Sequence, residues 1–125
     1  MSEDVKRRPL RPASGAMLSL KIMDEASRLK AKPEWSSVNR LAESLVKNDA
    51  LNVLLMVLKQ GARLAEHRTK GPIAVQVISG LIRFSAKGES VELSAGSIAA
   101  LDREVVHEVE ALDESIVLLT SAIES

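Results

Sequence analysis

The sequence predicts an all-β domain, built as an antiparallel sandwich or a small barrel. From residue 73 onward, six short runs rich in Val, Ile or Leu follow one another, and turn-forming residues such as Ser79-Gly80 and Ala95-Gly96 separate them. The predicted strands are Ile73–Ser79, Leu81–Ser85, Val91–Ser94, Ser97–Leu101, Val105–Ala111 and Ser115–Ser121. Neither a long amphipathic helical pattern nor an internal repeat is present, which argues against α/β and solenoid folds.

The beginning of the chain has a different character. Residues 1–16 combine proline with basic side chains and few apolar ones, so we predict a flexible lead there. Asp24–Lys32 is predicted to form a short helix, or otherwise an irregular arm, ahead of the strands. Asp24 is the expected N-cap, and Pro33 is expected to end the helix.

Two further strands are predicted over Arg40–Lys47, where apolar residues alternate loosely, and over Leu51–Lys59, a dense aliphatic run that Gln60-Gly61 stops.

The chain has 125 residues and a mass of 13.5 kDa, a size typical of one domain. We therefore predict that residues 17–125 form a single domain.

Composition excludes several kinds of site and partner. Cysteine is absent, which rules out disulfides, thiolate metal sites and cysteine nucleophiles. Seventeen Lys and Arg balance 17 Asp and Glu, a total that argues against nucleic acid as a ligand. The longest fully apolar run, Val53–Leu58, is too short to cross a bilayer, and residues 1–15 show no secretory signal. We therefore expect a cytoplasmic protein with neither nucleic acid nor membrane as a partner.

Alternation along the predicted strands assigns side chains to faces. In Val105–Ala111 the two glutamates share one face, so His107 is predicted to point inward with the aliphatic residues of the other face. Ile73–Ser79 and Leu51–Lys59 carry apolar residues on both faces. A strand of that kind in a single-layered wall needs a second cover, and we expect a homodimer to supply it.

The two histidines of the chain stand at set distances from glycines. Five residues separate Gly61 from His67, and the same stretch closes with a second glycine at Gly80. Ten residues separate Gly96 from His107. Fifteen residues, 81–95, separate the two stretches.

The spacing resembles the two motifs of the cupin family of small jelly-roll barrels. In the first motif a histidine and a glutamate follow His67, where this chain has Thr69 and Ile73. In the second, the positions of a proline, a glycine and an asparagine hold Asp102, Glu104 and Ala111. The resemblance covers about residues 50–121 and implies an antiparallel double-sheet jelly-roll barrel. It also implies that the strands after Gly61 and Glu104 are neighbours.

The resemblance further implies a pocket lined by His67, Thr69, Ile73 and His107, with His67 and His107 as ligands of a divalent metal ion such as Zn, Fe, Mn or Ni. Two imidazoles need a carboxylate or a third nitrogen to hold such an ion, whereas isoleucine cannot ligate. An acid from another strand would have to complete the set, and the candidates are Glu43 and Glu92.

Two functions are consistent with these residues. The first is a small-molecule-binding protein whose pocket is anchored by two histidines, with apolar walls suited to a small organic anion or an apolar ring. The second is a metal-dependent cupin enzyme, oxygenase-like or isomerase-like. The sequence identifies neither the substrate nor a catalytic residue, and it leaves open whether the protein is an enzyme.

Overall fold

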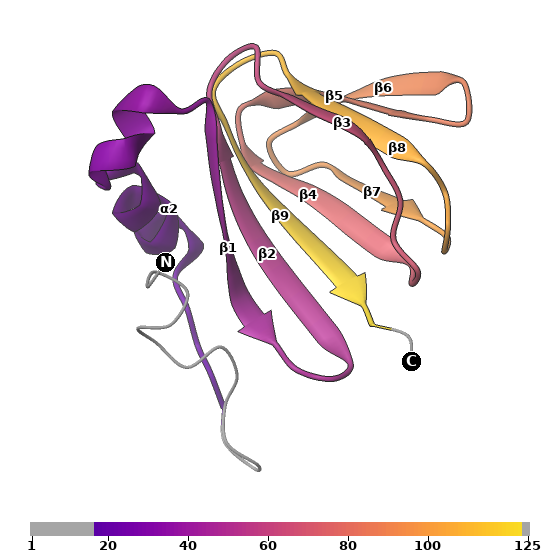
Figure 1. Ribbon diagram of the computed structural model, residues 1–125, viewed down its shortest axis with the longest axis horizontal. Coiled ribbons are helices and arrows are strands. Elements are labelled where there is room, and N and C mark those ends of the chain that lie inside the picture. Colours follow the sequence, from indigo (N-terminus) through magenta and orange to yellow (C-terminus); the bar gives the residue numbers. More distant parts are fainter. Residues whose placement is uncertain (1–16, 124–125) are drawn as a thin grey trace.

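Two antiparallel sheets face one another in the structure (Figure 1). The computed structural model describes residues 17–123, apart from the side chains of residues 66 and 67. One sheet has five strands in the order β1-β2-β9-β4-β7, and the other has four in the order β3-β8-β5-β6. Their bounds are β1 Arg40–Lys47, β2 Leu51–Leu58, β3 Arg63–His67, β4 Ile73–Ser79, β5 Leu81–Ala86, β6 Glu89–Ser94, β7 Ile98–Leu101, β8 His107–Ala111 and β9 Ser115–Ala122. The predicted antiparallel double-sheet architecture is confirmed, and the predicted flexible lead lies outside the described residues.

The main hydrophobic core lies between the two sheets. Alternation along β4 turns Val75 and Val77 inward, and both are fully buried. They pack with Ile82 and Phe84 from β5 and with Val109 from β8. Because side chains of both sheets meet in one cluster, this core holds the two layers together.

The helix α2, Ile22–Lys30, begins earlier than the sequence predicts. The prediction of Asp24 as the N-cap is wrong: Lys21 occupies that position without a side-chain cap, and Asp24 lies in the first turn. In the first turn, the negative charge of Asp24 interacts favourably with the positive end of the helix dipole, so Asp24 still stabilises the start of α2. Pro33 opens a short 3₁₀ helix, η1 (Pro33–Ser37). No helix in residues 17–123 is long and apolar enough to span a membrane.

The helix α2 covers part of the outer face of the five-stranded sheet (Figure 1). Its Ala26 and Leu29, each 1% exposed, pack against Leu55 and Val57 of β2 and Ile116 of β9. The apolar outer face of β2, predicted to need a second subunit, is thus covered in part by the chain's own helix. Alternation within a strand shows that a cover is needed but does not identify which segment supplies it.

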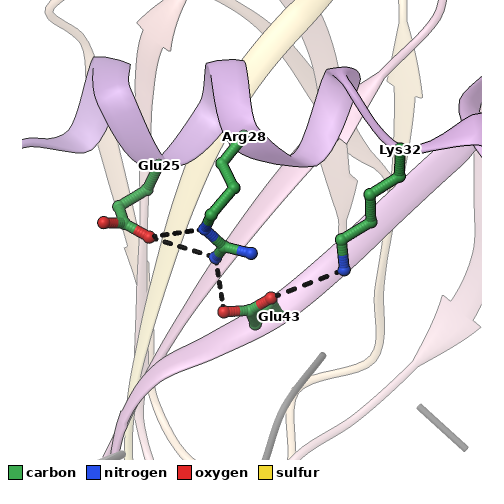
Figure 2. Close-up of polar contacts among 4 residues, drawn as sticks. All are labelled: Glu25, Arg28, Lys32 and Glu43. Carbon is green, nitrogen blue, oxygen red and sulfur yellow. Dashed lines mark hydrogen bonds and ion pairs between the residues drawn. The ribbon is translucent and has the colours of Figure 1, made fainter. Parts of the chain in front are cut away.

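A charged cluster joins α2 to β1 beside this apolar contact (Figure 2). Arg28 donates from Nη2 to Glu43 Oε2 at 2.6 Å and to Glu25 Oε1 at 3.0 Å. Lys32 Nζ lies 3.8 Å from Glu43 Oε1. The side chain of Glu43 is 1% exposed, so these cations compensate a carboxylate that has lost nearly all of its water.

The outer face of the four-stranded sheet is charged and faces solvent. Arg63 on β3 pairs with Glu108 on β8, and Arg83 on β5 pairs with Glu110 on β8 and with Glu92 on β6. These pairs run across the strands on the face opposite the core. Such a surface gives no hydrophobic gain on burial, so we expect it to stay in contact with water.

We expect the part of the five-stranded sheet that α2 leaves uncovered to join two copies of the chain. Ile98, 62% exposed, and Leu51, 38% exposed, carry apolar surface on this side of the sheet, and uncharged side chains of β4 and β9 lie between them. Light scattering at micromolar concentration should give the mass of a dimer, and Ile98→Lys should shift it toward a monomer. A stable wild-type monomer would contradict this prediction.

Candidate functional site

A cavity of about 370 Å³ opens between the two sheets. Strands β2 and β9 form one wall, and β3 and β8 form the other. The lining residues are Arg40, Asn52, Leu54, Met56, Leu64, Ala65, Thr69, His107, Glu108, Val109, Leu119 and Ser121. Its size and its mixture of aliphatic and polar groups are typical of small-molecule sites.

The wall made by β2 and β9 is graded from apolar to polar. Leu54 is paired with Leu119 across these two strands, and two residues further along Asn52 is paired with Ser121. Because alternate residues share a face, all four side chains line the same cavity. A ligand in the cavity would meet a hydrocarbon surface in one part and hydrogen-bonding groups in the next.

His107 stands at the start of β8 and is 5% exposed. Its Nδ1 lies 3.1 Å from the carbonyl oxygen of Val105, and its ring centroid lies 5.7 Å from that of Phe84. The Val105 carbonyl oxygen can only accept a hydrogen bond, so Nδ1 is the protonated donor and in the neutral ring Nε2 carries the lone pair. The ring is therefore held in the tautomer that accepts a hydrogen bond or ligates through Nε2.

The backbone of His67 lies directly opposite that of His107 in the pairing of β3 with β8. The predicted neighbourhood of the strands after Gly61 and Glu104 is thus confirmed, whereas the side chain of His67 lies outside the described part. A backbone hydrogen bond of 2.9 Å from Glu104 N to Thr69 O also joins the loops of the two motifs. Glu104 has φ of 65°, a left-handed conformation that explains why the resembling motif has glycine there.

Thr69 and Ile73 occupy different surroundings. Thr69 lines the cavity together with His107, and its hydroxyl donates to the carbonyl oxygen of Gly71 at 2.9 Å. Ile73 is 4% exposed and packs within the main core. Of the four residues predicted for the pocket, Thr69 and His107 therefore line the cavity together, whereas the side chain of Ile73 is part of the main hydrophobic core.

Neither acid proposed as a further metal ligand reaches this cavity. Glu43 is turned to the outer face of β1, where Arg28 holds it (Figure 2). Glu92 lies on β6 at the far edge of the other sheet and pairs with Arg83. Both predictions are wrong, since loose alternation in the sequence did not fix the faces of these strands.

The donor set that the structure describes does not fit a resident metal ion. His107 supplies one imidazole, Thr69 supplies a neutral hydroxyl, and Ile73 supplies no donor. Among the side chains described, no three of His, Asp or Glu gather at one point. A divalent cation in a protein usually takes more donors than these, so we derive no chemistry through a metal here.

Several lining residues were not predicted from the sequence, among them the polar Arg40, Asn52 and Ser121. Asn52 is a polar residue within an otherwise aliphatic strand, and this interruption could have marked it as facing a polar space. Ser121 could have been found in the same way at the end of β9. Arg40 carries no such signal, because its place at the cavity depends on how β1 approaches β3.

A second groove, of about 440 Å³, lies at the opposite edge between β5, β6 and β7. Phe84, Val91, Leu101 and Val105 are among its lining residues, and its polar rim comes from the turn residues Lys87, Glu89, Ser90 and Asp102. It lacks His107 and Thr69, and it is more open to solvent than the first cavity. The first cavity is therefore the better candidate site.

Comparison with known proteins agrees with this architecture. No protein-family profile and no curated protein sequence matches the chain. A cupin superfamily protein from Desulfitobacterium hafniense superposes with a TM-score of 0.72 at 16% identity, over 94% of this chain and 99% of that one. An RmlC-like cupin from Desulfovibrio desulfuricans gives 0.63 at 17% identity, over 89% and 95%. A conserved protein of unknown function from Streptococcus pyogenes gives 0.65 at 21% identity, over 69% and 75%. The chain therefore has the fold of the cupins, an antiparallel double-sheet jelly-roll barrel.

Proposed function

We propose that this protein binds a small organic molecule in the cavity between its sheets, with the motif histidines His67 and His107 among the anchoring residues. The observation that carries the proposal is the cavity itself, in which aliphatic walls meet a small number of polar groups. Thr69 and His107 belong to these groups. Binding through apolar contact with a few orienting hydrogen bonds is the usual arrangement in such pockets.

The chemistry of His107 supports a role in recognition. In a buried imidazole whose Nδ1 donates to the Val105 carbonyl oxygen, the hydrogen-bond acceptor is Nε2. A hydroxyl or amide of the bound molecule is the complementary donor. The aliphatic wall around Leu54 and Leu119 supplies contact area, while Asn52 and Ser121 supply further polar contacts.

Thermal melts with a panel of small organic acids, alcohols and amides test the proposal. We expect at least one compound to raise the melting temperature of the wild type, by about 5 °C at ten times its Kd for a chain of this length. Leu119→Trp should abolish the rise by filling the cavity. The matched control is Leu118→Trp, on the opposite face of the same strand, which should retain it. A panel without effect, or a rise that survives in Leu119→Trp, would refute binding in this cavity.

A metal-dependent enzyme is the second candidate, favoured by the opposed backbones of His67 and His107. Under that candidate, Zn²⁺ or Ni²⁺ raises the melting temperature of the wild type, and His67→Ala and His107→Ala each remove the rise. For the binding protein that we propose, neither ion has an effect, whereas His107→Ala weakens the organic ligand. Elemental analysis after metal-supplemented growth provides the independent measurement.

A further inference from the structure

Arg40 differs from the other five arginines in the described part of the chain. Each of those five has a carboxylate within 4.0 Å, whereas none of the carboxylates that the structure describes pairs with Arg40. The pairs are Arg28 with Glu25 and Glu43, Arg63 with Glu108, Arg68 with Glu104, Arg83 with Glu92 and Glu110, and Arg103 with Asp102. Among the described arginines, Arg40 is therefore the one whose charge no described carboxylate compensates.

The position of Arg40 connects this cation to the cavity. Arg40 is the first residue of β1, and its side chain lines the cavity between the sheets. Its Nη1 donates to the carbonyl oxygen of Arg63 at 3.1 Å, a contact that fixes the guanidinium against β3. A guanidinium has five N–H donors, and a neutral carbonyl does not compensate its charge. The group is therefore oriented by the protein without being neutralised.

Among the lining residues that the structure describes, Glu108 is the other charged one. Its carboxylate pairs with Arg63 on the outer face of the sheet, where Arg63 Nη2 lies 3.4 Å from Glu108 Oε1. The remaining described lining residues are apolar or carry neutral polar groups. Arg40 itself is exposed to solvent, so water partly screens its attraction for an anion, which then amounts to one charge-assisted contact.

We propose that the cavity selects small aliphatic carboxylates, whose carboxylate group is bound by Arg40. This inference rests on the proposed binding function and names the class of ligand. A planar guanidinium matches a carboxylate in shape and charge, and one cation suits a monoanion. The wall formed by Leu54, Met56, Leu64 and Leu119 receives the hydrocarbon part, and among the lining side chains that the structure describes His107 has the one aromatic ring.

Hexanoate and hexanamide provide the test, since they match in length and differ mainly in charge. Titration calorimetry or NMR titration gives the Kd of each for the wild type and for two variants. We expect hexanoate to bind the wild type about tenfold more tightly than hexanamide, as one charge-assisted contact should allow. In Arg40→Gln the Kd values of hexanoate and hexanamide should become about equal, while the affinity for hexanamide stays nearly unchanged. Arg83→Gln, which removes a paired arginine on the outer face, should preserve the preference.

The outcomes separate this inference from the function on which it rests. Wild-type protein that binds both probes equally, or an Arg40→Gln variant that keeps the preference, would refute the role of Arg40 and leave small-molecule binding intact. A wild type that binds neither probe but responds to another compound in the thermal panel would refute the carboxylate class alone. Failure of the entire panel would refute the binding function as well.

Discussion

Gly80→Ala is expected to lower the free energy of unfolding by about 4 kcal/mol, the sum of backbone strain and steric overlap. Gly80 has φ of +96°, a region that L side chains rarely adopt. A Cβ at this position would lie 2.7 Å from Ser115 Cα, and closer still to Ser115 Oγ and the Glu114 carbonyl oxygen. Ser115 is fully buried, and its hydroxyl accepts a hydrogen bond of 3.0 Å from Leu81 N, so it cannot move aside cheaply.

Gly96→Ala is the matched control for Gly80→Ala. Gly96 has φ of +88°, and a Cβ there would meet nothing within 4 Å, so only the strain remains, about 1–2 kcal/mol. Urea denaturation of both variants gives the difference between them. Equal losses in the two variants would show that the close approach of Ser115 to Gly80 does not constrain the barrel.

Glu43→Ala is expected to lower the free energy of unfolding by about 3 kcal/mol, because it removes the buried carboxylate that pairs with Arg28 and Lys32. Arg28 would keep Glu25 as a partner, but its Nη1, already buried without a hydrogen bond, would lose the compensating charge of Glu43 beside it. We therefore expect α2 to loosen from β1, and amide hydrogen exchange in the helix to accelerate along with the loss of stability.

Glu92→Ala provides the comparison for Glu43→Ala. Its carboxylate is 58% exposed and lies 3.7 Å from Arg83, so its loss should cost less than about 1 kcal/mol. The double variant Glu43→Leu with Arg28→Leu should recover part of the stability, since apolar side chains can replace a buried ion pair. A Glu43→Ala variant as stable as Glu92→Ala would mean that the cluster does not hold the helix.

The strands could be predicted because their signals are local. Ile73–Ser79 has the predicted bounds, and the other predicted strands end within two residues of the observed ones. Strand β3 is missing from the apolar runs because, of its five residues, just Leu64 and Ala65 are apolar. The cover that α2 provides could not be predicted, since Ala26 and Leu29 give no sign of which sheet face they meet.

The candidate site could be predicted only where residue type and spacing carry information. The motif spacing placed His67 opposite His107 correctly at the level of the backbone. It did not reveal Arg40, which belongs to a strand before the first motif and reaches the cavity through the contact with Arg63. Contacts between the edges of two sheets depend on their packing, and no short sequence pattern records them.

NMR of the protein with labelled methyl groups tests the central claim, that the cavity between β2, β9, β3 and β8 is a small-molecule site. With a compound that raises the melting temperature, we predict intermolecular NOEs to the methyl groups of Leu54, Val109 and Leu119. NOEs confined to Val91 and Leu101, in the groove at the opposite edge, would contradict the claim by placing the compound elsewhere.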